Sequence, residues 1–486
     1  MSTKDSDHSS YSDDLPRIVV LGAGPAGLSA SWKLLKGGIK PVIIERSPFA
    51  GGLMRGIQHG DFTVDFGRKE IYNRTPEVTA FWEELLRDDF IEYTHRIGLL
   101  YQNHLIDYSP EFRGPLRGIP VSLLGSCLAG FLKARLSSLK AAPPKNYEER
   151  WYQSWGKPLS MMASQGFSEK FYGVPWKDRP VEFDLRRHDK HKGSKSVGQH
   201  LKALQSQIFG NPDANRTWRH PRRSTQQLVD NAVEEIQKLG GIFHFETAVT
   251  SLTKGDNGIS EVTVKRGDET QVLKVKELVS TIPMLALADL LGLDKISDPI
   301  ADRNEGRESF FLYLFLNRPA LFPQAWLNVS SPDLALGRVV NYGAFGGDMV
   351  PEGKGCVCLE LFTRKGEGFA DRDNDDIAAQ LIEEAEGASL INASDIIDRK
   401  IIRIAGAEAS NEFQTWQDEK VQGLLREFRT YSNLYDANRA GIDVACFAGI
   451  CAADAVLTGN RERFDREASP ELSPQWASSA ANTPQP

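Results

Sequence analysis

The sequence predicts an α/β protein whose N-terminal part is a Rossmann-like nucleotide-binding domain. The first observation is a short apolar run, residues 17–21, which is typical of a buried parallel strand. The second is a G-x-G-x-x-G turn at residues 22–27, followed by a helical pattern that ends at Gly37. The third is a second strand, residues 41–44, with Glu45 directly behind it. Strand, turn, helix, strand and acid occur in the order of the dinucleotide-binding fingerprint.

Each part of this turn has a physical role in holding a dinucleotide. Gly22 permits the tight turn, and Gly24 lacks a Cβ atom, so the backbone can approach a pyrophosphate there. Gly27 lets the helix pack closely on the strand, and the helix N-terminus offers N–H groups to the phosphates. Glu45 is placed to accept hydrogen bonds from a ribose. The predicted cofactor-binding residues of this unit are Gly22, Ala23, Gly24, Pro25, Ala26, Gly27 and Glu45.

Length, charge and cysteine content limit the class of protein. At 486 residues the chain can form two or more domains with sizeable cores. Its net charge of −7 argues against nucleic-acid binding. The five cysteines show no metal-ligand spacing. We therefore expect reduced thiols, no metal site and a reducing, cytoplasmic setting.

The two ends of the chain and one apolar stretch bear on its partners. Residues 1–15 are rich in Ser and Asp, and residues 468–486 are rich in Ser, Pro and Ala, so both are predicted to be disordered. No run is long enough to span a bilayer. The run that comes nearest, residues 121–132, has the length of a buried or pocket-lining helix. The alternative is a weak membrane-surface contact through residues 121–135, which include two cations at their end.

The segment behind Glu45 carries a family resemblance. A glycine pair, Gly51-Gly52, follows soon after the acid, as in flavoproteins with this βαβ unit. A second pattern then matches at Asp65, Gly67, Tyr72, Pro76, Glu77 and Val78. The sequence here resembles the protoporphyrinogen oxidase, amine oxidase and UDP-galactopyranose mutase group of FAD proteins. The resemblance implies FAD as the cofactor, and it adds Arg46, Gly51, Gly52 and Leu53 to the predicted binding residues.

The centre of the second pattern departs from the family. Arg68 and Lys69 stand where the family has Gly-His, in a loop that the resemblance places beside the isoalloxazine ring. Two cations there would stabilise an anionic reduced flavin or an anionic substrate. Alternatively, both side chains turn outward to solvent. Arg68 and Lys69 are therefore candidate cofactor-binding residues with two open interpretations.

Three later motifs extend the resemblance to the FAD-binding end of the chain. Residues 278–283 are close to the family's Val-Ser-Thr-Ile-Pro crossing strand. The resemblance implies that the backbone at Val249 contacts the adenine and that Arg439 lies by the FAD phosphates. Residues 444–457 are expected to form a helix whose N-terminus points at the pyrimidine end of the flavin. The alternative is a strand at residues 444–447.

The second half of the chain reads as a substrate-domain sheet. Four runs are typical of strands and follow the order of the family's sheet: residues 310–316, 326–329, 337–342 and 356–361. Arg338 matches the arginine of that family pattern. The resemblance suggests that Arg338 faces the substrate, and the alternative is a surface arginine that pairs across strands.

The resemblance implies a discontinuous domain organisation. A Rossmann-like FAD-binding domain of the GR2 type would combine residues 16–105, 220–298 and 428–467. A mixed α+β substrate domain would combine a helical part, residues 106–219, with a sheet-rich part, residues 299–427. The predicted fold class is α/β with this second, mixed domain.

The predicted function is that of an FAD-dependent oxidoreductase that oxidises a small organic substrate by hydride transfer to flavin N5. One alternative is a non-redox mutase or isomerase acting on a nucleotide sugar, and another is a degenerate flavin-binding scaffold in a biosynthetic complex. No catalytic residue can be assigned, because His220 and His244 lack partner spacing and are expected to be surface or satisfied core histidines. The substrate and the oligomeric state stay open.

Overall fold

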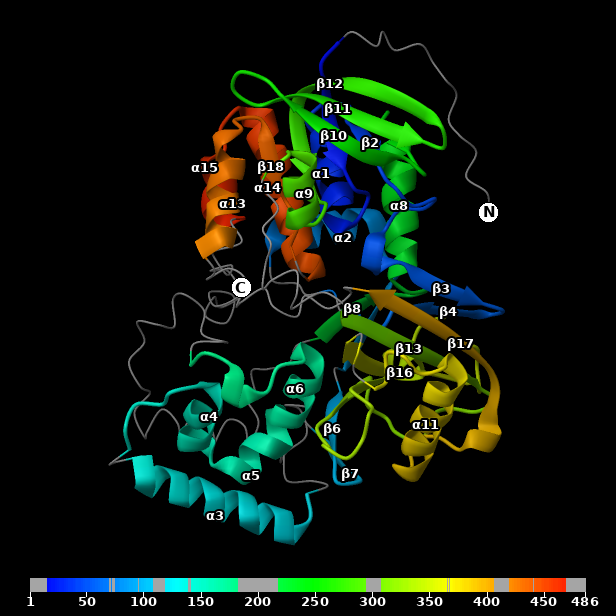
Figure 1. The fold of residues 1–486 in the computed structure, drawn as a ribbon. Coiled ribbons are helices and arrows are strands. Elements are labelled where there is room, and N and C mark those ends of the chain that lie inside the picture. The colour runs from blue at the N-terminus through cyan, green and yellow to red at the C-terminus, as the bar shows by residue number, and fades with distance from the viewer. Residues whose placement is uncertain are drawn as a thin grey trace, which may run out of the picture.

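The computed structural model describes residues 15–69, 71, 75–94, 96–107, 119–138, 141–181, 217–293, 307–364, 366, 368–405, 419–439 and 441–468. Tyr72 and the chain ends predicted to be disordered (1–14 and 469–486) lie outside these residues. Figure 1 shows two lobes, a nucleotide-binding lobe at the top and a sheet with helices below it. The first and last described segments of the chain both belong to the upper lobe.

The upper lobe contains a seven-stranded sheet. Its order is β10-β11-β12-β1-β2-β9, and β18 also pairs with β12. The parallel members end at one level, because Leu21 pairs with Ile44 and with Ser280, and Ser280 pairs with Asp436. Ligands of such sheets bind beyond the carboxyl ends of the strands. The strands are β1 (Arg17–Leu21), β2 (Val42–Ile44), β9 (Ile242–His244), β10 (Ala248–Lys254), β11 (Ile259–Arg266), β12 (Glu269–Ser280) and β18 (Leu434–Asp436).

Helices cover both faces of this sheet. Val20 of β1 packs in one core cluster and its neighbour Val19 in another, so the strand is buried on both sides. This explains why the strand reads as a continuous apolar run rather than an alternating one. On the Val20 side lie α1 (Pro25–Lys36), α2 (Pro76–Leu86), α8 (Thr225–Lys238), α14 (Ile442–Thr458) and α15 (Glu462–Glu467). On the Val19 side lie α9 (Met284–Leu290) and α13 (Glu419–Thr430).

The lower lobe is organised around a second seven-stranded sheet, in the order β17-β13-β16-β15-β14-β6-β7. The helix α11 (Asn374–Gly387) covers one face and buries Ile377 and Leu381. The strands are β6 (Ile97–Tyr101), β7 (His104–Asp107), β13 (Arg307–Leu316), β14 (Trp326–Val329), β15 (Arg338–Asn341), β16 (Gly355–Arg364) and β17 (Ile396–Ala405). All four strands predicted for the substrate domain are present. One difference from the predicted boundaries is that β6 lies here, paired with β14, although residues 16–105 were assigned to the nucleotide-binding domain.

Short elements join the two lobes. The hairpin of β3 (Gly56–His59) and β4 (Phe62–Asp65) leaves the nucleotide-binding lobe through the 3-10 turn η1 (Gly52–Met54). A second ribbon pairs β5 (Phe90–Thr94) with β8 (Thr217–Pro221). Two further 3-10 turns, η5 (Tyr342–Phe345) and η6 (Ala393–Asp395), flank the lower sheet.

The predicted helical insertion is present beside the lower sheet. It contains α3 (Val121–Ser138), α4 (Tyr147–Trp155), α5 (Lys157–Ser160), the π-helical turn η2 (Met161–Gln165), α6 (Gly166–Tyr172) and η3 (Trp176–Asp178). Contrary to the expectation of a buried helix, α3 exposes four large apolar side chains: Val121 (86%), Leu128 (57%), Leu132 (53%) and Leu136 (73%). Among the described helices, none is both long enough and apolar enough to cross a membrane.

Candidate functional site

The glycine-rich turn lies at the carboxyl end of β1 and is held in a tight conformation. Gly22 has φ +97°, and its N–H donates to the carbonyl of Ile44 on β2 (2.8 Å). A Cβ atom added to Gly27 would lie 1.9 Å from the carbonyl oxygen of Gly22. The first turn of α1 therefore packs directly on the end of β1, which only a glycine at Gly27 allows.

Gly24 differs from Gly27, because no contact within the protein requires a glycine there. No described atom lies within 4 Å of a Cβ built on Gly24, and its φ of −76° suits any residue. It is the N-cap of α1, which has no side-chain cap and no acid in its first turn. No described atom therefore lies over Gly24, and no acid in the first turn of α1 offsets the partial positive charge of its N-terminus. A pyrophosphate fits this arrangement.

The predicted glycine pair lies next to this opening. The N–H of Gly51 donates to the carbonyl of Ala23 (2.8 Å), and a Cβ on Gly52 would lie 3.4 Å from the Cα of Gly24. Both glycines have positive φ, +104° and +53°. Leu53, which follows, is 46% exposed. The two glycine segments therefore form a narrow cradle of bare backbone, which fits the phosphates of FAD.

Glu45 lies at the carboxyl end of β2, beside the same turn. Its Oε2 accepts the N–H of Ala23 and its Oε1 accepts the N–H of Ser47, each at 2.8 Å. These bonds orient the carboxylate and leave further lone pairs for ribose hydroxyls. The next residue, Arg46, is exposed. The structure thus groups the predicted residues 22–27, Glu45, Gly51, Gly52 and Leu53, while their contacts with FAD stay a prediction.

The N-terminal half of a second helix, α14, packs against the first turns of α1. A Cβ on Gly449 would lie 2.1 Å from the carbonyl oxygen of Ala26, and Ser29 Oγ donates to the carbonyl of Cys446 (3.0 Å). The expected helix after Gly441 is confirmed as α14, and the alternative strand at residues 444–447 is wrong. Its N-cap Gly441 has no side-chain cap, but the buried carboxylate of Asp443 lies in its first turn and already faces the partial positive charge of this N-terminus.

Two residues assigned to the cofactor by resemblance make their contacts with other parts of the chain than the cradle. Arg439 Nε donates to the carbonyl of Ala468 (2.8 Å), and its Nη2 donates to the carbonyl of Asp436 (2.8 Å). Its guanidinium is therefore committed to its own strand end and to the segment behind α15. Val249 lies in β10, where it pairs with Val264. Their phosphate and adenine contacts stay predictions.

The loop that follows β4 is fixed by a buried carboxylate, Asp65. Its Oδ2 lies 2.7 Å from Nε2 of His220, and its Oδ1 accepts the N–H (2.7 Å) and the hydroxyl (2.8 Å) of Thr225. Burial would raise the pKa of Asp65, but the charge of His220 and the hydrogen bonds from His220 and Thr225 outweigh it and hold the pKa below its usual value.

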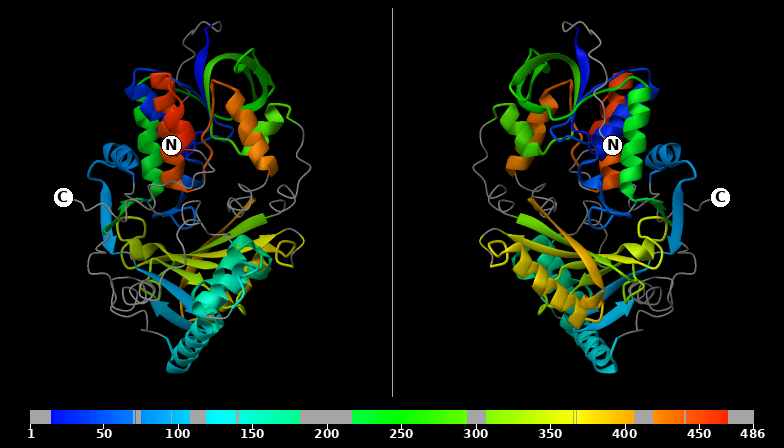
Figure 2. Two further views of the ribbon diagram at one scale, coloured as in Figure 1. Left: turned by 90° about the vertical axis from the view of Figure 1, so that its left-hand side faces the viewer. Right: turned by 90° about the vertical axis from the view of Figure 1, so that its right-hand side faces the viewer.

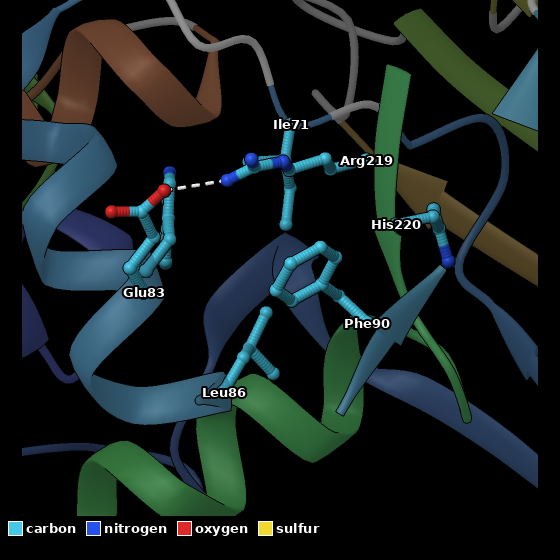
Figure 3. Close-up of a pocket in the computed structure, with 7 residues that line it drawn as sticks. Ile71, Glu83, Leu86, Phe90, Arg219 and His220 are labelled. Atoms are coloured by element: carbon cyan, nitrogen blue, oxygen red, sulfur yellow. Dashed lines mark hydrogen bonds and ion pairs between the residues drawn. The ribbon is translucent and has the colours of Figure 1, made fainter. Parts of the chain in front are cut away.

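His220 is confirmed as a satisfied core histidine. Its Nδ1 lies 2.8 Å from the carbonyl of Pro221, so both ring nitrogens face acceptors, and the cationic ring is favoured. Figure 3 shows His220 at the edge of a small pocket, where Glu83 and Arg219 form an ion pair of 2.5 Å. The cavity volume is only about 20 Å³. The pocket lining is Ile71, Trp82, Glu83, Leu86, Phe90, Arg219 and His220. Its charges are paired, so it offers no catalytic group.

Two tyrosines from the lower sheet hold the same loop, and sequence reasoning missed both. Tyr313 accepts the N–H of Gly67 (2.8 Å) and donates to the carbonyl of Asp65 (3.1 Å). The hydroxyl of Tyr342 lies 2.8 Å from the carbonyl of Asp65 and 2.9 Å from that of Gly67. Burial raises the pKa of both phenols well above the usual value, so they stay neutral donors. Their only sequence signal was that a buried tyrosine usually finds a hydrogen-bond partner for its hydroxyl.

Arg68 lies against the lower sheet rather than in solvent. Its guanidinium carbon lies 4.5 Å from the ring centre of Trp326, and its backbone N–H donates to Oε1 of Glu360 (3.2 Å). Arg68 and Lys69 are both half-buried. The solvent-facing interpretation is therefore wrong for Arg68, while the contact of either cation with the flavin stays a prediction.

Arg338 is buried and pairs with the same glutamate. Its Nη1 lies 2.8 Å from Oε2 of Glu360, with side-chain exposures of 10% and 1%. The guanidinium carbon lies 5.4–5.5 Å from the ring centres of Phe167, Phe171 and Phe362. The alternative of a surface arginine is wrong, although the pairing across strands β15 and β16 is present. Glu360 therefore connects the loop of Gly67 and Arg68 to Arg338.

The described residues contain no cluster of three or more groups that could hold a metal ion. The five cysteines are free and buried. Cys356 and Cys358 lie on one face of β16, as their spacing predicts. The site is thus a backbone cradle in one lobe and a loop clamped by the other lobe.

Comparisons with known proteins agree with this geometry. The family described as flavin containing amine oxidoreductase matches residues 25–305. The fold is similar to that of reduced UDP-galactopyranose mutase, with a TM-score of 0.74 at 19% identity over 95% of this chain and 99% of that one. It is also similar to a protein of Exiguobacterium sp. 255-15 described as a protoporphyrinogen oxidase, with a TM-score of 0.66 at 11% identity over 92% and 99%.

The curated relatives that match do so over a short part of the chain, 15–20% of its length. Flavin-containing monooxygenase 3 of Rattus norvegicus is 31% identical over 100 residues, which are 20% of this chain and 18% of that protein. The match spans less than a fifth of the relative, so it speaks for a shared segment rather than a shared activity.

Proposed function

The chain belongs to the flavin-containing amine oxidoreductase family, and we propose that it oxidises a small organic molecule by transfer of a hydride to FAD. Membership makes the protein a flavoenzyme with FAD as its cofactor. The observation that carries the proposal is the cradle of Gly24, Gly52 and the N-terminus of α1, which agrees with this cofactor. The nature of the substrate and the direction of electron flow belong to the proposal.

The residues of the upper lobe would bind the cofactor. Gly24, Gly52 and the first turn of α1 would receive the pyrophosphate, and Glu45 would accept hydrogen bonds from the ribose. FAD, when bound, supplies the hydride acceptor that no side chain can provide.

The residues of the lower lobe would position the substrate. The loop of Asp65 and Gly67 is hydrogen-bonded to both lobes, so its backbone would form a rigid boundary of the substrate site. Such rigidity fixes the distance between the reacting atoms and excludes water. Arg338 would bind an acceptor group of the substrate, because its Nε is buried and has no hydrogen-bond partner among the described residues.

A non-redox mutase is the second candidate, and it is favoured by one observation. Reduced UDP-galactopyranose mutase is the similar structure with a TM-score of 0.74 over 95% of the chain. Arg68, Lys69 and Arg338 would suit the diphosphate of a nucleotide sugar. In this case the reduced cofactor would be regenerated at the end of each turnover, with no net oxidation of the substrate.

The test uses purified full-length protein and its own flavin absorbance. The proposal expects a yellow protein whose absorbance bleaches under anaerobic conditions when one class among amines, porphyrinogens, polyenes and nucleotide sugars is added. Turnover that requires prior reduction of the flavin, with the substrate isomerised and not oxidised, would establish the mutase instead. A colourless protein that does not take up FAD on reconstitution would favour a degenerate scaffold.

A further inference from the structure

The helix α3 presents an apolar face that no other described part of the chain covers. Val121 is 86% exposed, Leu128 57%, Leu132 53% and Leu136 73%. With 3.6 residues per turn, these four positions fall within about 80° of the helix circumference. They therefore form one continuous stripe along the outer side of the helix, which we call the α3 stripe.

The opposite side of α3 is packed firmly, so the stripe is a fixed feature of the surface. Cys127 is buried in a small core cluster with Leu99 and Met162. A Cβ on Gly130 would lie 2.7 Å from Cδ of Pro158, and a Cβ on Gly156 would lie 2.5 Å from the backbone of Gly130. Because the inner face is already occupied, a small rotation cannot bury the stripe.

The position of α3 leaves the stripe accessible to a large partner. Figures 1 and 2 show α3 at the end of the molecule farthest from the nucleotide-binding sheet, lying along the outer edge. At 18 residues it is about 27 Å long, and it does not meet the requirements for crossing a bilayer. A helix of this kind can lie in the plane of a surface.

The charge of the surrounding sequence indicates which surface would fit. The whole chain has a net charge of −7, yet the stretch between Glu111 and Glu148 contains no Asp or Glu. Its cations are Arg113, Arg117, Lys133, Arg135, Lys140 and Lys145. In α3 itself, Lys133 is exposed beside the stripe, where a long side chain reaches a lipid headgroup region, whereas Arg135 is half-buried over the ring of Phe131 (5.3 Å). A second copy of this cationic segment would be repelled, whereas an anionic bilayer surface would be attracted.

We propose that the α3 stripe docks the protein on the surface of an anionic membrane. The four apolar side chains would enter the boundary between headgroups and acyl chains, while the flanking cations would bind anionic headgroups. The helix would lie parallel to the membrane, with the nucleotide-binding lobe directed away from it. This proposal does not depend on the reaction catalysed.

Co-sedimentation of the flavin-loaded protein with vesicles tests the proposal. Vesicles of phosphatidylcholine with phosphatidylserine should bind the protein at least about tenfold more strongly than phosphatidylcholine alone. Raising the salt from about 0.1 M to about 0.5 M should weaken that binding, since the Debye length shortens.

Matched variants distinguish binding through the α3 stripe from non-specific hydrophobic binding to vesicles. The triple variant L128Q, L132Q and L136Q should lose at least about tenfold in vesicle binding. The control triple variant V272Q, L321Q and I397Q changes three similarly exposed apolar residues elsewhere (48%, 49% and 53%) and should bind as the parent does. Unchanged flavin absorbance and melting temperature show that both variants fold.

Two outcomes would overturn the proposal. One is equal binding to both kinds of vesicle, or binding that the α3 variant retains. The other is a parent protein that ignores vesicles but is a dimer in solution and becomes monomeric in the α3 triple variant, which would assign the stripe to a second copy of the chain.

Discussion

Replacing Gly24 by Ser should weaken FAD binding while leaving the folded protein at least as stable. Gly24 is the N-cap of α1, with φ −76° and ψ −174°, and a new Cβ would meet no described atom within 4 Å. Serine is among the best N-cap residues, since its hydroxyl accepts an N–H of the first turn. The substitution thus improves the helix of the cofactor-free protein and occupies the N–H groups that the pyrophosphate would use.

The expected sizes of the two effects follow from the same contact. Because glycine is itself a tolerated N-cap, the new serine cap should stabilise the cofactor-free protein by only about 0.3 kcal/mol. The loss of one charge-assisted hydrogen bond to phosphate costs about 1.5–3 kcal/mol. At about 1.4 kcal/mol per factor of ten, this corresponds to roughly a tenfold to hundredfold rise in the Kd for FAD.

Fluorescence titration of the deflavinated protein with FAD measures the Kd, and thermal unfolding of the same sample measures stability. Gly27→Ala is the contrasting variant, because its Cβ would lie 1.9 Å from the Gly22 oxygen and should lower the stability of the cofactor-free protein itself. Gly387→Ala meets no described atom within 4 Å and serves as the neutral control. A G24S protein that binds FAD as tightly as the parent would refute the assignment of the cradle.

Three further predictions concern the buried groups. His220→Gln should destabilise the protein by about 3–5 kcal/mol in urea unfolding, because Asp65 would lose its buried cation. The pKa of Asp65 is lower in the folded than in the unfolded protein, so its ionised carboxylate stabilises the fold above the unfolded pKa, and this stabilisation is lost as the pH falls through the folded pKa. The free energy of unfolding of the parent should therefore fall below about pH 4, and it should fall less steeply in H220Q. Glu360→Gln should also lower the free energy of unfolding by about 3–5 kcal/mol, because it leaves the charge of Arg338 uncompensated. The double variant with Arg338→Met should recover part of this loss, and a single variant as stable as the parent would contradict a buried ion pair. Burial raises the pKa of Cys451 to about 12, and all five cysteines are buried, so a thiol reagent at neutral pH should label the unfolded protein but not the native one.

Local sequence patterns predicted the structure of the nucleotide-binding unit correctly. β1, the tight turn and α1 are each determined by neighbouring residues, since the requirement for glycine at Gly27 comes from an oxygen five positions away. The helix α14 was likewise readable from its own apolar pattern and from the glycines at its ends. By contrast, the boundary of the first domain was misplaced at β6, because its pairing with Trp326 is not visible in residues 97–101 themselves.

The clamp on the loop of Asp65 and Gly67 shows a similar limit of sequence reasoning. Asp65 and His220 are 155 positions apart, and Tyr313 and Tyr342 reach the loop from a different lobe, so no spacing rule connects them. The departure at Arg68 and Lys69 does not disturb this clamp, because the clamp acts on Asp65 and Gly67, which keep the family pattern. Gly67 has φ +64° and is close to Phe311, so its place allows no other residue without strain. The clamp therefore holds the two family-pattern positions, Asp65 and Gly67, in place whichever side chains stand at 68 and 69.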